Sequence, residues 1–132
     1  LPRGHRLEKK QPLETKDLVP REMVLLEEGH CLTDQTLSLC QRSKGGARED
    51  FQATGLETLR HLVATGAGYT LIPFLAVPSS PKLSPLIHYL SFKGKVGRKI
   101  ILVHREGFSR KNDISTLVDF LKHHLPTGVT PL

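Results

Sequence analysis

The stretch that decides the fold is residues 23–40, MVLLEEGHCLTDQTLSLC, where a compact apolar run is followed by a polar turn and a helical pattern. Met23–Leu26 is typical of a buried strand, because four consecutive apolar residues suit a strand that is covered on both faces. Leu32–Gln41 predicts a helix, and the residues after it, RSKGG, are a strong signal for a loop. A buried strand that leads into a helix is the basic unit of an α/β fold.

The segments next to this unit continue the pattern. Residues 1–21 are polar and contain three prolines, so they predict a connection with a short helical turn around Glu14–Leu18. Downstream we expect a short strand at Phe51–Ala53 and then a helix. A capping box is expected to open this helix, with Thr54 as the cap and Glu57 reaching back to it. The helix should stop near Gly66.

The second half of the chain alternates in the same way. Tyr69–Ile72 is expected to be a strand, and Pro73 is expected to start a short helix that runs to Val77. Further strands are expected at Ile87–Leu90 and Arg98–His104. The last helix has apolar residues at helical spacing from Ile114 to Leu125; we expect Asn112 or Asp113 to cap it and Pro126 to end it. The fold class is therefore α/β, with a mainly parallel sheet covered by helices.

Length and composition are those of one domain or a large piece of one. The chain has 132 residues and a formal charge of +6, but its basic residues are dispersed, aromatic residues make up 5% and there is no Trp. Direct nucleic-acid binding by this segment is therefore not favoured. No apolar run approaches the roughly 18 residues of a membrane span, and no secretory signal is visible. Because the chain starts at Leu1 without an initiating Met, we expect a piece of a longer protein.

The two cysteines carry the most promising chemistry. Cys31 stands where the strand gives way to the helix, and the free N–H groups of a first helical turn stabilise a thiolate. His30 is expected to help as a cation or donor. Cys40 follows nine residues later, a separation of roughly 13–14 Å along a helix and on its opposite face. A disulfide needs Cα atoms within about 7 Å, so the two thiols cannot pair unless the helix unwinds. That coupling of chemistry to shape is typical of a redox switch.

Other interpretations of the same residues stay open. Cys40, among apolar neighbours, is also what a buried core cysteine looks like, and Cys31 alone could be inert. A metal site at His30 and Cys31 is not favoured, because no ligand spacing such as CxxC accompanies them. A Cys–His hydrolase lacks the nucleophile-elbow pattern around Cys31. We therefore expect no metal, no cofactor and no catalytic residue in this chain.

Three stretches resemble a known family. Residues 27–35, EEGHCLTDQ, with Cys40 nine residues after Cys31, are similar to the sensor segment of the OxyR branch of LysR-type transcription regulators. Residues 51–60, FQATGLETLR, also resemble that branch. Residues 62–73, LVATGAGYTLIP, resemble LysR-type regulators more generally. The resemblance covers nearly the whole chain and implies an effector domain with the fold of periplasmic binding proteins.

The resemblance implies roles for individual residues. By position, Cys31 matches the cysteine that reacts with peroxide and Cys40 the resolving cysteine. His30, Asp34 and Arg98 match residues that support the reactive thiolate or line its pocket, and a guanidinium beside a thiolate would lower the pKa of that thiol. Thr33 stands at a further pocket position, where the family has a basic residue. Gly55 also departs from the pattern, replacing a small hydroxyl residue.

The resemblance also implies an organisation and a set of partners. Residues 1–104 would be most of the second α/β subdomain of the effector region, and residues 105–132 a return segment and helix that belong to the first subdomain. An N-terminal winged helix-turn-helix would lie outside this chain and contact DNA. Expected partners are hydrogen peroxide as the signal, further copies in a homodimer or homotetramer, RNA polymerase, and a thiol reductant such as a glutaredoxin. The protein would be bacterial and cytoplasmic, with no membrane contact.

Two competing functions remain at this stage. One is a LysR-type effector domain that binds a small-molecule inducer and whose cysteines are incidental. The other is a thiol peroxidase, which would turn over with a reductant rather than react stoichiometrically. The reaction of Cys31 with peroxide separates the first from a redox sensor, and sustained turnover separates the second.

Overall fold

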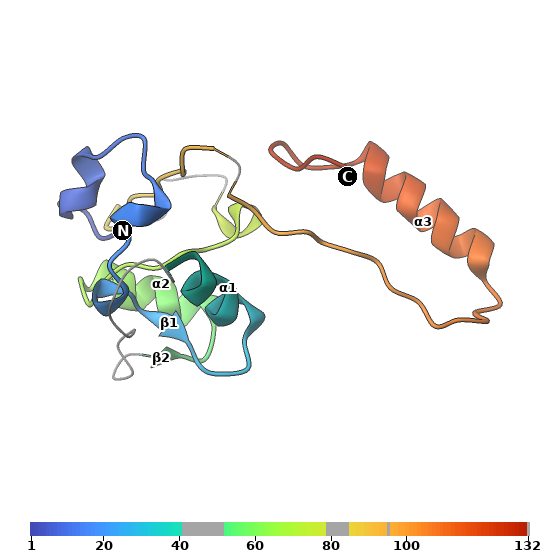
Figure 1. Cartoon of the computed structure of the whole chain (residues 1–132), viewed down its shortest axis with the longest axis horizontal. Helices are drawn as coiled ribbons and strands as arrows, with labels where there is room; N and C mark the ends of the chain where they lie inside the picture. The colour runs from blue at the N-terminus through green and yellow to red at the C-terminus, as the bar shows by residue number, and fades with distance from the viewer. Residues whose placement is uncertain (41–51, 79–84, 95, 132) are drawn as a thin grey trace. The chain divides into compact units, whose positions relative to one another are not determined.

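The computed structural model describes residues 1–40, 52–78, 85–94 and 96–131, which form two compact units, Leu1–Val96 and Gly97–Leu132 (Figure 1). The unit boundary falls earlier in the chain than the expected subdomain boundary at residue 104. None of the helices in the described residues has the length and apolar character needed to cross a bilayer.

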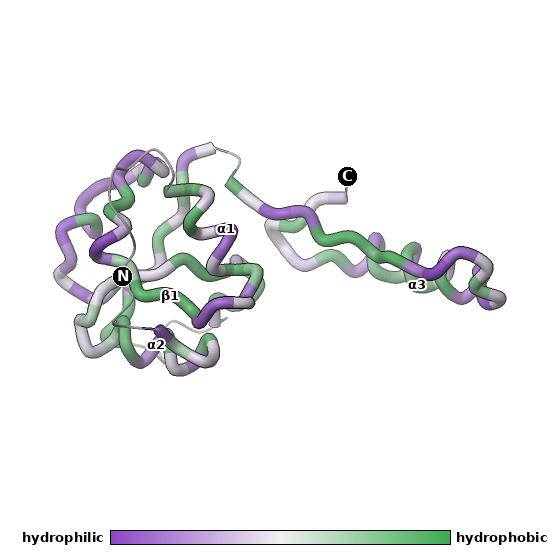
Figure 2. The backbone as a smooth tube through the Cα atoms, turned by 60° about the horizontal axis from the view of Figure 1, so that its bottom comes forward, coloured by the Kyte–Doolittle hydropathy of each residue, from purple (hydrophilic) through white to green (hydrophobic). Residues whose placement is uncertain are grey.

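The first unit is built around a short parallel strand pair. Strand β1 (Leu25–Leu26) lies beside β2 (Gln52–Ala53), with Leu25 opposite Gln52 and Leu26 opposite Ala53. This confirms the strands expected in Met23–Leu26 and in the last residues of Phe51–Ala53; Phe51 itself lies outside the described residues. The run around β1 is strongly hydrophobic and enters the interior (Figure 2), as expected for a buried strand.

A second parallel contact joins the start of this strand to the segment after α2. Met23 pairs with Tyr69, where the Val24 N–H donates to the Tyr69 carbonyl at 2.8 Å and the Tyr69 N–H donates to the Glu22 carbonyl at 3.0 Å. The approach is so close that only glycine fits at position 68, because a Cβ there would stand 2.4 Å from the Glu22 carbonyl oxygen. Glycine is required here by contact and not by its own backbone angles.

Two helices pack against the strand pair. Helix α1 (Cys31–Cys40) agrees with the prediction of Leu32–Gln41 to within one residue at its start, and Gln41 lies outside the described residues. Helix α2 (Leu56–Ala64) buries Leu59 and Val63 on one stripe, as predicted. The capping box at Thr54 and Glu57 is wrong. The N-cap is Gly55 and no side chain caps the helix, because α2 begins one residue too late for Thr54 to reach its first N–H groups.

Short 3-10 turns make up much of the remaining structure of this unit. They are η1 (Arg6–Lys9), η2 (Thr15–Asp17), η3 (Pro20–Glu22) and η4 (Phe74–Ala76). The second confirms the helical turn expected around Glu14–Leu18, and the fourth the short helix expected between Pro73 and Val77. Pro73 is the N-cap of η4 and not its first helical residue.

Two predicted strands of the first unit shrink to single bridges. Counting only pairs between described residues, Tyr69 alone pairs in Tyr69–Ile72, and Ile87 alone pairs in Ile87–Leu90, antiparallel to Pro2. A further bridge joins Leu13 to Phe92. An apolar run becomes a strand only where another backbone runs beside it to complete the ladder, and sequence pattern alone does not supply that partner.

The second unit holds helix α3 (Lys111–His123). The expected caps are wrong: Arg110 is the N-cap, no side chain caps the helix, and Asn112 and Asp113 lie within its first turn. Asp113 instead forms an ion pair with Arg110. The helix stops before Leu125, in keeping with the restriction that Pro126 places on the residue before it.

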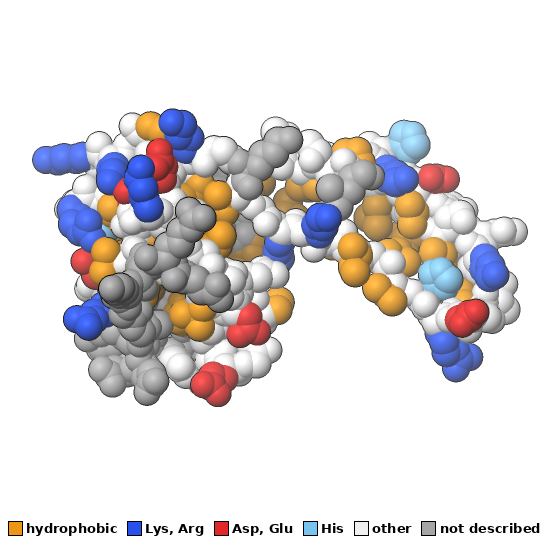
Figure 3. Space-filling model, viewed as in Figure 1, with side chains coloured by type: hydrophobic (Ala, Val, Ile, Leu, Met, Phe, Trp, Pro, Cys, Tyr) orange, Lys and Arg blue, Asp and Glu red, His pale blue; other side chains and the backbone are white. Residues whose placement is uncertain are grey.

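The strand predicted at Arg98–His104 is also wrong for this structure, because these residues form no ladder with any described residue. Ile100, Ile101 and Val103 are largely exposed there, as are Leu117 and Phe120 on α3. Hydrophobic side chains are open to solvent on the face of this unit that Figure 3 shows.

Candidate functional site

The two cysteines are the first and last residues of α1. The turn that delivers the chain from β1 to Cys31 passes through Gly29, whose φ of 91° lies in the region that favours glycine. The helix is continuous between the two cysteines, and both thiols are free. Nine residues of helix separate them by roughly 13–14 Å of rise and half a rotation, well beyond the reach of a disulfide. The predicted incompatibility of helix and disulfide therefore applies to this structure.

Cys31 is exposed, and so are its neighbours His30 and Asp34. Within the described residues, the side chains of His30 and Asp34 form no ion pair or hydrogen bond with one another or with a third group. Cys31 is thus open to a small solute at the N-terminal end of a helix, where free backbone N–H groups favour a developing negative charge. His30 precedes it directly in the chain, and Asp34 follows it three residues later in the first turn of the helix.

Thr33 has a different surrounding. Its side chain is buried, and its hydroxyl donates a hydrogen bond of 2.9 Å to the Leu26 carbonyl at the end of β1. Its N–H donates to the His30 carbonyl at 2.9 Å. Thr33 therefore anchors the first turn of α1 to the strand, which holds Cys31 at a fixed place on the surface.

Cys40, at the other end of α1, is only 3% exposed. Its thiol donates to the thioether sulfur of Met23 at 3.5 Å. Burial raises the pKa of the Cys40 thiol, which keeps it protonated and less nucleophilic. It belongs to an apolar cluster whose other buried members are Leu7, Leu13, Leu18, Met23, Leu25 and Tyr69. The burial expected for Cys40 is confirmed.

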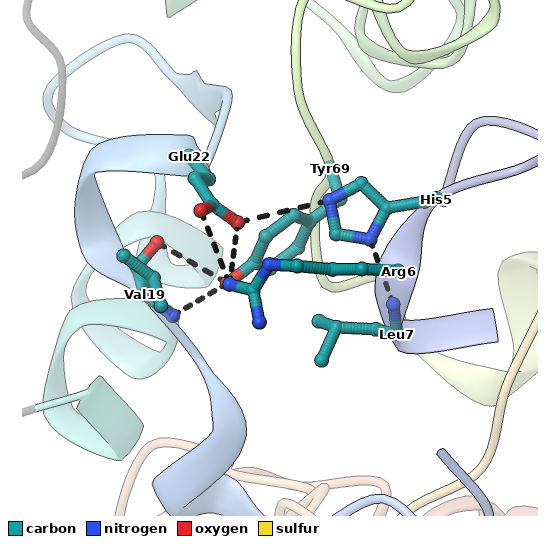
Figure 4. A network of polar contacts seen from close by, with 6 residues as sticks. All are labelled: His5, Arg6, Leu7, Val19, Glu22 and Tyr69. Atoms are coloured by element: carbon teal, nitrogen blue, oxygen red, sulfur yellow. Dashed lines mark hydrogen bonds and ion pairs between the residues drawn. The ribbon is translucent and has the colours of Figure 1, made fainter. Parts of the chain in front are cut away.

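Polar contacts fix the position of Tyr69 in this cluster (Figure 4). Its hydroxyl accepts from the Val19 N–H at 2.6 Å and donates to the Val19 carbonyl at 3.2 Å. The ring of His5 meets that of Tyr69 edge-on at 5.3 Å, and burial lowers the pKa of His5. The Glu22 carboxylate lies 3.7 Å from Nε2 of His5 and 2.9 Å from Nη2 of Arg6. The N-terminal segment is thus tied down over the cluster that receives Cys40.

The sequence did not point to Met23 or Tyr69 as parts of the site. Both were expected as strand residues, and no local motif marks a contact between residues 17 positions apart. The expected supporting residue Arg98 belongs to the second unit, where it is exposed, and its role stays a prediction. Among the described residues, no three His, Cys, Asp or Glu side chains gather in a way that could hold a metal ion.

The comparison with known proteins now decides the family. Residues 1–126 match the family model described as LysR substrate binding domain. The chain belongs to this family. The LysR-type resemblance is confirmed, and with it the general fold of periplasmic binding proteins, here seen as helices packed on parallel strands.

Curated relatives of this LysR-family chain carry names that refer to hydrogen peroxide. It is 39% identical over 111 residues to the "Hydrogen peroxide-inducible genes activator" of Pectobacterium carotovorum subsp. carotovorum, which covers 83% of this chain and 36% of the relative. It is 40% identical over 108 residues to the "DNA-binding transcriptional dual regulator OxyR" of Escherichia coli (strain K12), with 80% and 35% covered. For the "Probable hydrogen peroxide-inducible genes activator" of Mycobacterium avium the identity is 36% over 124 residues, with 92% and 39% covered.

The likeness to the OxyR branch is thereby confirmed. The chain spans little more than a third of the length of these relatives. No solved structure matches it significantly. The names of these relatives describe gene regulators, so the thiol-peroxidase interpretation finds no support among them.

Proposed function

We propose that this chain is the redox-sensing regulatory domain of a hydrogen-peroxide-responsive LysR-type transcription regulator, and that Cys31 and Cys40 are its switch. The observation that carries the proposal is that one continuous helix begins with an exposed cysteine and ends with a buried one. The names of the relatives point to the same signal.

The chemistry proceeds in two balanced steps. The Cys31 thiolate attacks one oxygen of hydrogen peroxide, so that an S–O bond forms, the O–O bond breaks and hydroxide leaves. The Cys40 thiol then attacks the sulfenic sulfur of Cys31, and water leaves as the disulfide forms. In the first step Cys31 is oxidised and peroxide is reduced, and the second step stores that oxidation as a disulfide.

The second step forces a change of shape. Because the two cysteines lie roughly 13–14 Å apart along α1, the helix must unwind before their Cα atoms come within about 7 Å. Cys40 loses its place beside Met23, and the cluster that includes Leu7, Leu18 and Tyr69 loses one member. A chemical signal is thus converted into the repacking of a core, which can bias an interface elsewhere in the protein.

The supporting residues have proposed roles as well. His30 directly precedes Cys31 and Asp34 lies three residues after it, and both would guide the proton that leaves its thiol. Arg98 would add positive charge near the thiolate, and Thr33 would keep the first turn of α1 in place while the rest unwinds. These assignments rest on the resemblance together with the local contacts described above.

For the whole protein we propose the organisation of the family. Residues 1–104 would form most of the second subdomain, and residues 105–132 would join the first. The exposed apolar side chains of the second unit support this assignment, because such residues are normally covered in a folded protein. A winged helix-turn-helix would bind DNA, the effector domains would assemble as a homodimer or homotetramer, and RNA polymerase would be the target. A reductant such as a glutaredoxin would restore the thiols in the bacterial cytoplasm.

The proposal is tested in a bacterium whose own copy of the gene is replaced. Transcripts are measured after a pulse of peroxide in strains with the unchanged gene, Cys31→Ser and Cys40→Ser. We expect peroxide-dependent transcription in the first strain and its loss in Cys31→Ser, with Cys40→Ser impaired. If Cys31→Ser responds like the unchanged gene, the cysteines are incidental and the interpretation as a small-molecule-responsive regulator gains support.

A further inference from the structure

Two of the three sulfur atoms in this chain touch each other in its core. The chain contains two Cys and a single Met. The Cys40 sulfur lies 3.5 Å from the Met23 sulfur, and the two residues are 3% and 1% exposed. In the reduced protein the Met23 thioether is therefore covered, and the Cys40 side chain is one of the groups that cover it.

We propose that Met23 is a second, slower oxidation site that peroxide reaches only after Cys40 has left, and that its sulfoxide holds the switch in the oxidised conformation. The inference rests on the proposed function, since it takes the Cys31–Cys40 disulfide as the event that uncovers Met23. It adds a residue that the cysteine chemistry does not use.

The contacts of α1 indicate which end of the helix moves. Its first turn is anchored to β1 through the buried hydrogen bond of 2.9 Å from the Thr33 hydroxyl to the Leu26 carbonyl. At the other end of the helix, the Cys40 side chain donates a weak S–H hydrogen bond to the Met23 sulfur. Unwinding from the Cys40 end breaks the weaker attachment, so Cys40 is the residue that travels and Met23 is the residue left behind.

The oxidation of Met23 needs no further reactant than peroxide. The thioether sulfur attacks one peroxide oxygen, so that an S–O bond forms, the O–O bond breaks and one water molecule leaves after proton transfer to the departing oxygen. Sulfur loses two electrons and peroxide gains them. The product, methionine sulfoxide, is polar and strongly hydrogen-bonding, whereas the thioether is apolar.

The sulfoxide would stand where the Cys40 side chain has to return. Its neighbours in the cluster include the apolar side chains of Leu13 and Leu25, which offer no hydrogen bond, and a buried polar group without a partner is costly. A thiol reductant reduces the disulfide but not the sulfoxide, which needs its own reductase. The protein would then stay open after the disulfide has gone, as a record of sustained peroxide.

The test follows Met23 and both cysteines by peptide mass spectrometry in the full-length protein. Reduced protein is treated with excess hydrogen peroxide and sampled over time, with thiols alkylated at each point. In the unchanged protein we expect the disulfide first and then a gain of one oxygen on the Met23 peptide. In Cys31→Ser, which cannot form the disulfide, Met23 should be oxidised at least about tenfold more slowly, because local opening limits its access.

Equal rates of Met23 oxidation in the two proteins would overturn the inference, as would an unoxidised Met23 after complete disulfide formation. If no disulfide forms, the proposed function fails on the same spectra, and Cys40→Ala then tests the shielding by itself. Met23 should be oxidised faster in Cys40→Ala than in Cys31→Ser, and equal rates there contradict the inference. Circular dichroism and a thermal melt establish that each variant is folded.

Reversal of the oxidation tests whether the Met23 sulfoxide keeps Cys40 out of the core. After long peroxide treatment, a dithiol reduces the disulfide and the alkylation rate of Cys40 reports whether it has returned to the core. We expect Cys40 to stay rapidly alkylated in the unchanged protein and to become protected again after treatment with a methionine sulfoxide reductase. In Met23→Leu, a swap that keeps the volume, protection should return with the dithiol alone. Full protection of Cys40 beside an intact Met23 sulfoxide would show that the sulfoxide does not keep Cys40 out of the core.

Discussion

At the scale of single residues, Cys31 and Cys40 show how the same thiol is given two properties by its surroundings. Cys31 stands at the exposed first residue of a helix, where peroxide can reach it. Cys40 lies against Met23 and Tyr69 in an apolar cluster, where burial raises the pKa of its thiol. The order of the proposed reaction follows from this difference, because the exposed thiol meets the oxidant first and the buried one can only respond.

The buried Cys40 and Tyr69 make stability depend on alkaline pH. Burial raises the pKa of both groups, so above the ordinary thiol pKa of about 8.5 the native state holds protons that the unfolded chain has released. The free energy of unfolding should be insensitive to these groups below that pH and should fall as pH rises through the folded pKa values.

The measurement is urea unfolding of the reduced chain as a function of pH. In Cys40→Ala the fall should begin later, leaving the part that belongs to Tyr69. Ser38→Ala changes an exposed residue on the same helix that carries no titrating group and is the matched control, and its profile should follow that of the unchanged protein. A profile for Cys40→Ala with the same onset as the unchanged protein contradicts the assignment.

Gly68 tests the packing beside Tyr69. In Gly68→Ala the new Cβ would meet the Glu22 carbonyl oxygen at 2.4 Å and a Val24 methyl at 3.1 Å. Because the first contact is with backbone, the chain has to shift, and we expect the free energy of unfolding to fall by about 1–3 kcal/mol. Chemical denaturation measures it. The control is Gly97→Ala, where nothing lies within 4 Å and no loss is expected. Equal stability of the two variants would show that residues 22–24 and 68 do not approach as described.

At the scale of elements, α1 is the part of the fold whose stability the switch has to overcome. It is held at one end by Thr33 on the Leu26 carbonyl and at the other by the burial of Cys40. Helix α2 carries no cysteine and lies on the same strand pair, so it is a natural internal reference for changes confined to α1.

Disulfide formation should therefore be visible as a loss of hydrogen-exchange protection in α1. We expect amides in the second half of Cys31–Cys40 to exchange faster in the oxidised protein, while those of Leu56–Ala64 keep their rates. Exchange measured by mass spectrometry on reduced and oxidised samples checks this. Unchanged protection of α1 in a protein that carries the disulfide would mean that the helix does not unwind.

The sequence predicted the elements that are decided locally. Helix α1 was located to within one residue at its start and the strand at Leu25–Leu26 was correctly expected, because a run of apolar residues and a loop signal suffice for both. The strand predicted at Arg98–His104 has no partner among the described residues, since pairing depends on another part of the chain. The cap at Thr54 failed by one residue, which is the precision that helix starts allow.

The sequence likewise predicted one part of the candidate site and missed another. The position of Cys31 at the helix start and the burial of Cys40 followed from spacing and neighbours. The contact between Cys40 and Met23 did not, because it joins a helix to a strand, and only packing brings these two side chains together.

At the scale of the whole molecule, the second unit differs from the first in that none of its described residues is buried. Ile101, Val103 and Phe120 keep more than half of their surface accessible, at 73%, 79% and 55%. Within the proposed organisation these residues are covered by the first subdomain, in the part of the protein that this chain does not span.

Phe120→Ser tests whether the Phe120 ring, exposed in this chain, is covered in the full-length protein. In the 132-residue chain the substitution should change the free energy of unfolding by less than about 0.5 kcal/mol, because the ring is half exposed. In the full-length protein it should cost about 3 kcal/mol or more, as for an aromatic ring removed from a core. Chemical denaturation of both proteins gives the comparison, with Lys122→Ser as the control on the same helix. An equally small effect in the full-length protein contradicts the assignment of this unit to a first subdomain.

Peroxide is expected to join Cys31 to Cys40, and α1 has to unwind for this to happen. The most direct measurement treats reduced full-length protein with one equivalent of hydrogen peroxide, alkylates the remaining thiols and maps the peptides by mass spectrometry. We expect a Cys31–Cys40 disulfide that is absent in Cys31→Ser. If both thiols are recovered alkylated after that treatment, the redox switch is contradicted and the domain answers to another signal.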